Sequence, residues 1–119
     1  MSTVLIVDDS GFMRRIIRII LEKNGFTVVG EAVDGQSGVE IFKNLKPDLV
    51  TMDVTMNEMS GIEALREIMS IDPEAKVVMI SSMGQEVIVR EAVILGAKGF
   101  ILKPFEEHQI VDVLKKIMR

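Results

Sequence analysis

Short apolar runs alternate along the chain with longer segments in which apolar residues recur at helical spacing. Five of these runs are strand-like, at residues 4–7, 27–30, 49–52, 76–80 and 100–102. They lack the strict alternation of a half-exposed strand, and continuous apolar runs of this length are typical of parallel strands buried on both faces. Because a helical segment follows each run, the pattern predicts an α/β fold of the (βα)₅ type, with a doubly wound five-stranded parallel sheet.

The residues between the predicted elements support this division. Ser10, Asp34 and Ser60 stand where the first three helices should begin, and their side-chain oxygens are suited to cap a helix N-terminus. Gly25 follows the first helix, predicted at residues 11–24, and glycine is favoured just past a helix end. This first helix has a polar edge at four-residue spacing, formed by Arg14, Arg18 and Glu22.

Composition narrows the class of protein. A chain of 119 residues, 48% of them hydrophobic, is expected to form a single domain over residues 1–119. Cysteine is absent, which excludes disulfides and thiolate metal sites and favours the cytoplasm. No apolar run reaches about 18 residues and no signal peptide pattern follows Met1, so no membrane association is expected. The net charge of −4 and the lack of a dense basic stripe argue against nucleic-acid binding.

Polar side chains that could carry chemistry follow the apolar runs directly. Asp8 and Asp9 come after the first run, Asp53 after the third, Ser81 after the fourth and Lys103 after the fifth. In folds of this kind ligands collect at the carboxyl ends of the strands. Three neighbouring carboxylates repel one another unless a cation intervenes, and oxygen ligands without His or Cys favour Mg²⁺ over zinc. We therefore expect a Mg²⁺ site in which Asp53 could attack a phosphoryl group, with Lys103 as a second positive charge.

The fourth predicted helix, at residues 85–95, has more apolar positions than a core-facing stripe needs. At 100° per residue Val89 and Val93 widen the apolar arc, and Val87 and Ile94 lie beyond it. Some apolar surface should therefore be exposed, which indicates a binding surface.

Four motifs lie at the predicted strand ends in a definite order. They are Val-Leu-Ile-Val-Asp-Asp-Ser at residues 4–10, Asp-Val-Thr-Met-Asn-Glu-Met-Ser-Gly at residues 53–61, Ser81 after Val-Val-Met-Ile, and Gly-Ala-Lys-Gly-Phe-Ile-Leu-Lys-Pro-Phe at residues 96–105. Together they resemble the CheY-like receiver domains of response regulators, over nearly the whole chain. The resemblance is specific because it rests on four separated motifs, whereas a lone Asp-Asp pair would mean little. It implies a flavodoxin-like sheet with the strand order 2-1-3-4-5.

The resemblance also implies a role for particular residues. Asp53 would be the phosphoacceptor, and the Mg²⁺ ligands would be Asp9 directly, Asp8 beside it or through water, Asp53 itself and the backbone carbonyl of Thr55. Three further positions correspond to the switch hydroxyl, the phosphate-contacting lysine and the aromatic switch of the family, namely Ser81, Lys103 and Phe100. The Lys103–Pro104 bond would be cis, as is common in the family. The chain departs from the family at Asn57, where a proline is usual, so the loop loses a residue that fixes φ.

Partners follow from the same resemblance. A histidine kinase similar to CheA would supply the phosphoryl group, and no separate catalysis beyond phosphorylation and dephosphorylation of the chain itself is expected. The phosphorylated form would bind a downstream motor protein or an adaptor through its fourth helix, fifth strand and fifth helix, in chemotaxis control of a flagellar or archaeal motor. A phosphatase could also act on it, and the chain should be a monomer.

Other functions fit parts of the pattern. A single-domain phosphorelay receiver and an excised receiver of a transcription factor are alternatives within the family. A phosphatase similar to haloacid dehalogenases would have an Asp-x-Asp motif after the first strand, whereas Asp8 and Asp9 are adjacent. Flavodoxin would have a Gly/Ser/Thr phosphate cradle there instead of acids.

Overall fold

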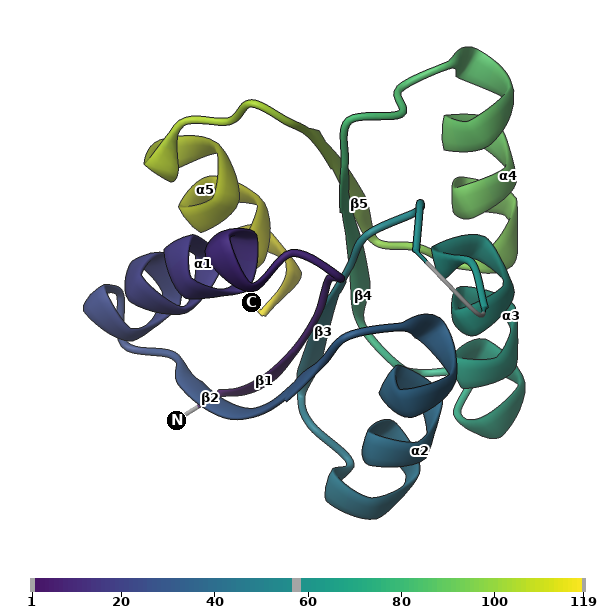
Figure 1. Ribbon diagram of the computed structural model, residues 1–119, viewed down its shortest axis with the longest axis horizontal. Helices are drawn as coiled ribbons and strands as arrows, with labels where there is room; N and C mark the ends of the chain where they lie inside the picture. Colours follow the sequence, from purple (N-terminus) through teal and green to yellow (C-terminus); the bar gives the residue numbers. More distant parts are fainter. Residues whose placement is uncertain (1, 57–58, 119) are drawn as a thin grey trace.

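The computed structural model describes residues 2–56 and 59–118, which form five strands and five helices in strict alternation (Figure 1). The strands are β1 (Thr3–Val7), β2 (Thr27–Ala32), β3 (Leu49–Met52), β4 (Val77–Ser81) and β5 (Gly99–Leu102). The helices are α1 (Gly11–Lys23), α2 (Gly35–Leu45), α3 (Gly61–Ile71), α4 (Glu86–Leu95) and α5 (Glu107–Ile117). The predicted (βα)₅ fold is confirmed.

All neighbouring strands pair in parallel, in the order β2-β1-β3-β4-β5. This is the order that the family resemblance implies. The chain adds β2 on one side of β1 and then continues on the other side with β3, so the direction of winding reverses beside β1. Crevices for ligands form at such a reversal, on the edge of the sheet where the strands end.

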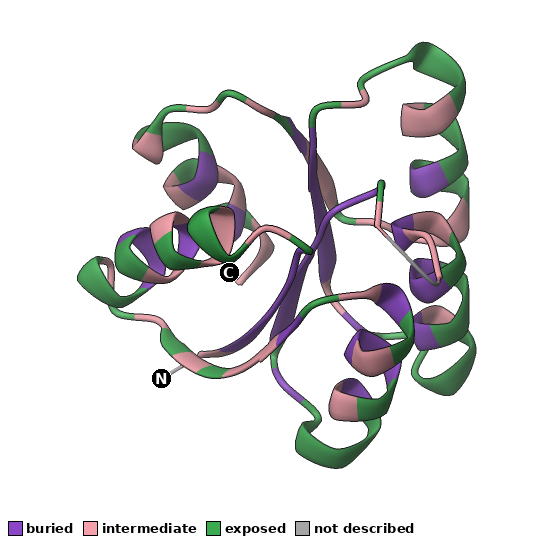
Figure 2. Ribbon diagram, in the orientation of Figure 1, coloured by how far each residue is buried: buried purple, intermediate pink, exposed green. Residues whose placement is uncertain are grey.

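Helices cover both faces of the sheet and enclose two separate cores. Figure 1 shows α1 and α5 on one face and α2, α3 and α4 on the other. Alternate residues of one strand serve the two cores, since Leu5 and Val7 pack with the α2, α3 and α4 side while Val4 and Ile6 pack with α1 and α5. Figure 2 accordingly shows β3 and β4 buried along their whole length and β1 buried after its first residue. This burial on both faces explains the continuous apolar runs.

The predicted caps hold the first three helices. Ser10 Oγ accepts a hydrogen bond from the backbone N–H of Met13, and Asp34 accepts one from Ser37. Ser60 forms a capping box with Glu63 at the start of α3. After α1, Gly25 has a φ of 88°, in the left-handed region that favours glycine.

Two strands end later than predicted. β2 continues to Ala32 instead of ending at residue 30, because Glu31 pairs with Ile6 of β1 while its charged side chain faces α1. β4 runs to Ser81 instead of residue 80, and Ser81 pairs with Leu102. In both places the prediction ended the strand at the last apolar residue, before a polar residue that still belongs to the strand. Among the described residues, no helix is both long and apolar enough to cross a membrane.

Candidate functional site

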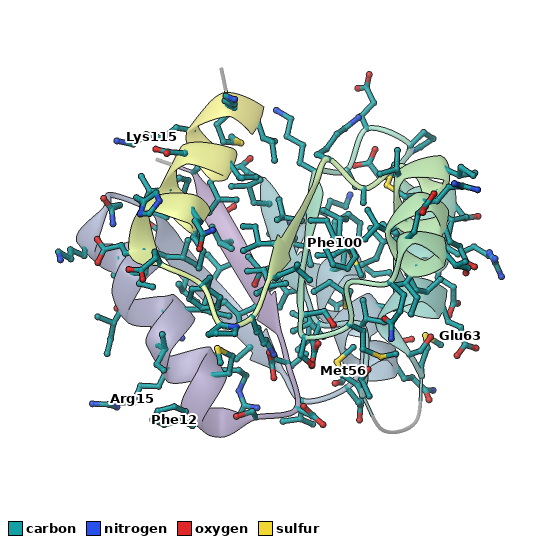
Figure 3. All side chains as sticks on the ribbon, turned by 90° about the horizontal axis from the view of Figure 1, so that it is seen from above. Phe12, Arg15, Met56, Glu63, Phe100 and Lys115 are labelled. Atoms are coloured by element: carbon teal, nitrogen blue, oxygen red, sulfur yellow. The ribbon has the colours of Figure 1, made fainter. Side chains whose placement is uncertain are left out.

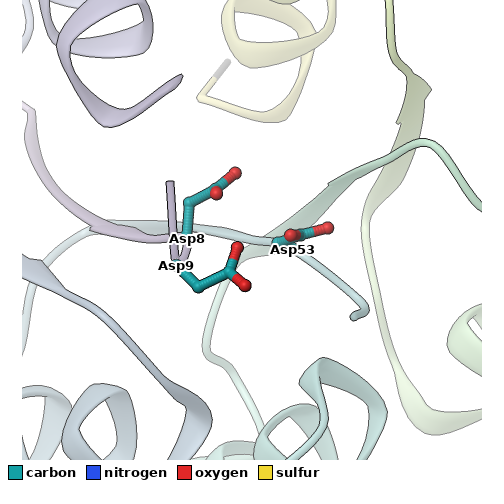
Figure 4. A group of neighbouring side chains, drawn as sticks. All are labelled: Asp8, Asp9 and Asp53. Carbon is teal, nitrogen blue, oxygen red and sulfur yellow. The ribbon is translucent and has the colours of Figure 1, made fainter. Parts of the chain in front are cut away.

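The three predicted carboxylates meet at the carboxyl edge of the sheet. Asp8 and Asp9 follow the last residue of β1, and Asp53 follows the last residue of the neighbouring β3. Figure 4 shows the three side chains gathered at this edge, and one carboxylate oxygen from each lies within 4.8 Å of the other two. Asp8 and Asp53 are buried, whereas Asp9 is exposed. The site is therefore an acidic pocket that opens to solvent on the Asp9 side.

Lys103 brings a positive charge into this pocket from the end of β5. Its Nζ lies 2.8 Å from Asp8 Oδ2 and 3.6 Å from Asp53 Oδ2. The peptide bond between Lys103 and Pro104 is cis, as the family resemblance implies. Lys103 thus neutralises part of the negative charge and bridges two of the three carboxylates.

The backbone and side chain of Asp8 are fixed by several hydrogen bonds. Its Oδ1 accepts a hydrogen bond from the backbone N–H of Ser10 at 2.9 Å, and its own N–H donates to the carbonyl of Ala32 on β2. Its carbonyl oxygen accepts a hydrogen bond from Arg14 Nη1 at 2.8 Å. Because Oδ2 bonds to Lys103, both carboxylate oxygens and both backbone groups of Asp8 have partners.

Opposing effects act on the Asp53 carboxyl. Burial raises its pKa above the ordinary value, the Lys103 ammonium partly opposes the shift, and the charges of Asp8 and Asp9 add to it. The side chain is only 8% exposed. Its negative form is therefore short of compensating charge, a condition that a bound cation would relieve.

Close packing holds the segment that follows Asp53. The first residue of α3 is Gly61, whose N–H donates to the carbonyl of Val54 at 2.8 Å. A Cβ at Gly61 would stand 1.8 Å from the carbonyl oxygen of Asp53, so only glycine allows the start of α3 to approach β3 this closely. The effect predicted for Asn57 concerns a position outside the described residues.

Ser81 and Phe100 lie on the neighbouring strands, beyond Asp53. Ser81 is fully buried at the end of β4, and its Oγ accepts a hydrogen bond from the backbone N–H of Met83 at 3.1 Å. Phe100 is half-buried on β5 and packs on the core that carries α4 (Figure 3). Thr55 is exposed, and its hydroxyl donates to the sulfur of Met83. The roles predicted for these three residues remain predictions.

The chemistry of the donors fits a hard divalent cation. Three carboxylates converge, and the described residues bring no His or Cys into the group. Oxygen donors of this kind suit Mg²⁺, which is bound through a few carboxylates and keeps several waters. Asp9 is exposed and accepts no hydrogen bond from the described part of the chain, so its carboxylate is free to ligate.

Some features of the site escaped the sequence pattern. Arg14 and Arg18 were predicted only as a polar edge of the first helix, yet both form ion pairs with Glu31, and Arg14 also reaches Asp8. The four-residue spacing of the arginines was the available signal, but their partner lies on β2. The exposed apolar surface predicted for α4 is confirmed, because Val87, Val93 and Ile94 are exposed while Val89 is half-buried.

Comparison with known proteins gives one consistent assignment. The family model for the response regulator receiver domain matches residues 4–115. The chemotaxis protein CheY of Thermotoga maritima is 53% identical over 98% of this chain and 97% of its own length, and CheY of Bacillus subtilis is 51% identical over 97% and 96%. A chain in the crystal structure of the CheX–CheY–BeF₃–Mg²⁺ complex from Borrelia burgdorferi is 38% identical in sequence to this chain. The two superpose with a TM-score of 0.97, covering 99% of this chain and 90% of that chain.

This assignment decides against the phosphatase and flavodoxin alternatives. The adjacent carboxylates after β1, the third carboxylate after β3 and the lysine after β5 are at the positions that the four motifs predicted. Receivers are signalling proteins and not classical enzymes. The chain belongs to the response regulator receiver family.

Proposed function

We propose that this chain is a phosphorylation switch of the chemotaxis type, which accepts a phosphoryl group on Asp53 in the presence of Mg²⁺. The observation that carries the proposal is the buried Asp53 carboxylate, which lies beside the Lys103 ammonium and two further carboxylates. Asp53 has the environment of a nucleophile in phosphoryl transfer, where positioning and charge compensation supply most of the catalysis. The family match supports this interpretation.

Asp53 attacks the phosphorus atom through a carboxylate oxygen and becomes an acyl phosphate, while the bond from phosphorus to the donor breaks. Lys103 neutralises charge on the transferred group, since its ammonium lies 3.6 Å from Asp53 Oδ2. Asp8, Asp9, Asp53 and the Thr55 carbonyl would hold Mg²⁺, which when bound would offset negative charge on the phosphoryl oxygens. The chain itself orients the nucleophile and keeps it partly shielded from water.

Phosphorylation would then be transmitted to the surface through Ser81 and Phe100. The Ser81 hydroxyl can donate a hydrogen bond to a phosphoryl oxygen, and moving it toward Asp53 would open space beside β4. Phe100 is on the adjacent strand and is paired with Met79. Because its ring has no polar group to satisfy, its position depends on space and apolar contact alone.

The partners proposed are a histidine kinase similar to CheA and a downstream motor protein or adaptor. Similarity to chemotaxis proteins at about 50% identity over nearly the full chain supports chemotaxis. The structure from Borrelia burgdorferi contains CheX with CheY, so a protein related to CheX is a further candidate partner. We propose that the phosphorylated form binds its target through the face formed by α4, β5 and α5.

Phosphorylation of the purified chain by acetyl phosphate tests the central claim. With Mg²⁺ present, we expect one acid-labile phosphate, located at Asp53 by mass spectrometry after borohydride reduction. Asp53→Asn should abolish it. Asp48→Asn is a matched control, because Asp48 precedes the same strand at its opposite end and is exposed.

The metal is tested separately by calorimetry. Asp9→Ala should weaken Mg²⁺ binding without unfolding the chain. Undiminished phosphate in Asp53→Asn would refute the assignment of the phosphoacceptor, whereas unchanged Mg²⁺ affinity in Asp9→Ala would refute only the assignment of the metal ligand.

A further inference from the structure

A chain of polar contacts connects the edge strand β2 with the backbone of the acidic pocket. Glu31, on β2, accepts a hydrogen bond from Arg14 Nε at 2.9 Å through Oε1 and one from Arg18 Nε at 2.7 Å through Oε2. Arg14 uses a second nitrogen, Nη1, to donate to the carbonyl oxygen of Asp8 at 2.8 Å. Arg14 is therefore held at one edge of its guanidinium by Glu31 and holds Asp8 with another nitrogen.

The location of the Arg14 side chain is well defined. It is 18% exposed, whereas the next residue, Arg15, is exposed and points into solvent (Figure 3). A methyl group at Gly11 would stand 3.4 Å from Arg14 Nη2, so the guanidinium lies over the first turn of α1. The planar guanidinium suits this place, because it presents Nε to Glu31 and Nη1 to the Asp8 carbonyl in fixed directions.

We propose that Arg14, itself held by Glu31, is a positioning residue for the metal ligand Asp9. The carbonyl that Arg14 holds belongs to the peptide group joining Asp8 to Asp9. Fixing that carbonyl fixes the plane of the peptide, and with it the direction in which Asp9 leaves the backbone. Asp9 accepts no hydrogen bond of its own within the described residues, so its orientation depends on this backbone support. The inference rests on the proposed function, in which Asp9 binds Mg²⁺.

Arg18 provides a matched control. It forms an ion pair with the same Glu31 carboxylate and carries the same charge, but its second contact is with Glu22 and not with Asp8. Arg18→Ala therefore removes one arginine and one bond to Glu31 without removing support from the acidic pocket. Arg14→Ala removes that support as well.

The two possible effects of Arg14 on Mg²⁺ binding have opposite signs. If Arg14 acted only through its charge, its removal would strengthen the binding of a cation, because like charges repel. If it positions the peptide of Asp9, its removal weakens binding, as losses of groups that orient metal ligands do. The direction of the change in affinity therefore separates the two effects.

The experiment measures Mg²⁺ affinity of the full chain by calorimetry, with thermal unfolding as a check of the fold. We expect about tenfold weaker binding for Arg14→Ala and less than a twofold change for Arg18→Ala. Arg14→Met, which keeps the apolar stem, should behave like Arg14→Ala and serves as the test if the alanine variant does not fold. With acetyl phosphate, the Mg²⁺ concentration for half-maximal rate should rise in the Arg14 variants while the rate at saturating Mg²⁺ stays near that of the wild type.

Equal or tighter Mg²⁺ binding by both Arg14 variants relative to Arg18→Ala would overturn the proposal. That result differs from a failure of the proposed function, in which the wild-type chain itself would bind no Mg²⁺. In the ¹⁵N spectrum, the amide of Asp9 should shift in Arg14→Met and stay in place in Arg18→Ala, a local signature that a general loss of stability would not produce.

Discussion

At the scale of single residues, the charges of the acidic pocket lower the free energy of unfolding. Asp53 is buried beside two other carboxylates, and one lysine is shared between Asp8 and Asp53. Burial raises the pKa of Asp53, so the folded chain disfavours the ionised form relative to the unfolded chain. The ionised carboxylate therefore lowers the free energy of unfolding at neutral pH.

Replacing this carboxylate should stabilise the chain without metal. We expect Asp53→Asn to raise the free energy of unfolding by about 1 kcal/mol at pH 7. The gain should diminish as the pH falls through the raised pKa of Asp53 and vanish below the ordinary value of 3.8, where the wild-type carboxyl is neutral in both states. Urea unfolding followed by circular dichroism suits a chain without Trp or Tyr.

Mg²⁺ provides the control for this prediction. Saturating Mg²⁺ should stabilise the wild type more than Asp53→Asn, because a ligand stabilises only the state that binds it. An asparagine variant that is less stable than the wild type at pH 7 in EDTA would contradict the prediction.

A second residue works against stability inside the sheet. Thr51, at 1% exposure, has an Oγ1 that forms no hydrogen bond within the described part of the chain. Valine has nearly the same shape without the hydroxyl, so Thr51→Val should raise the free energy of unfolding by about 1 kcal/mol. Thr51→Ser, which keeps the hydroxyl and loses a methyl, should lower it. If urea unfolding ranks serine above valine, the hydroxyl has a partner after all.

At the scale of elements, α1 is attached to the edge strand β2 through charged groups. Arg14 and Arg18 both contact Glu31, and Arg18 also pairs with Glu22 one turn later. The hydrogen bond from Arg18 lowers the pKa of Glu31, an effect that the bond from Arg14 increases and burial opposes. The folded chain therefore favours the ionised form of Glu31.

This network should contribute stability that depends on pH. Because the pKa of Glu31 is lower in the folded state, its contribution is complete above the unfolded value near 4.5 and is lost as the pH falls through the lower folded pKa. We expect Glu31→Gln to lower the free energy of unfolding by no more than about 1 kcal/mol at pH 7, since solvent reaches the network. The difference should vanish in urea unfolding once the pH lies below the lowered folded-state pKa of Glu31.

Glu22→Gln is the matched control for this network. Within the described part of the chain the Glu22 side chain pairs with Arg18 alone and is 51% exposed, so the change should be a few tenths of a kcal/mol at most. A loss for Glu31→Gln that persists unchanged in acid would show that packing and not charge explains it.

At the scale of the whole molecule, the acidic pocket and the exposed apolar surface belong to different parts of the sheet. The pocket is centred on β1 and β3, while α4 exposes Val87, Val93 and Ile94 beyond β4 and β5. A phosphoryl group must favour one arrangement of this surface over another by a differential free energy, or no partner could sense it. Ser81 and Phe100 occupy the strands between the two regions.

Substitutions on this surface should separate binding from phosphorylation. Val93→Asp and Phe100→Ala should weaken binding of the phospho-dependent partner about tenfold, while acetyl phosphate still modifies Asp53. Val33→Asp is the control, because Val33 directly follows β2, the edge strand opposite β5, and is 53% exposed, while Val93 is 59% exposed. Calorimetry with beryllium fluoride in place of phosphate measures the affinity. Wild-type affinity for the partner in both variants would show that the binding face lies elsewhere.

The sequence alone was sufficient for the architecture and for most of the acidic pocket. Strands buried on both faces need continuous apolar runs, so the central strands β1, β3 and β4 were visible, and short apolar runs also marked the edge strands β2 and β5. The rule that parallel strands end at one edge brought Asp8, Asp9, Asp53 and Lys103 together. The helix caps could also be predicted from the sequence, since the caps at Ser10, Asp34 and Ser60 depend on residues only three positions away. The strand order came from the family resemblance and not from the pattern.

Contacts between residues that are distant in sequence could be identified only from the folded structure. The sequence pattern placed Arg14 on the polar edge of a helix. Its contact with Asp8 is supported by Glu31, which lies 17 positions away on β2. The end of that strand was missed because Glu31 is charged. The lack of a hydrogen-bond partner for the Thr51 hydroxyl within the described residues likewise follows from which neighbours surround it. Periodicity specifies which face of an element is apolar, but the partner of a polar side chain is fixed only when the elements pack.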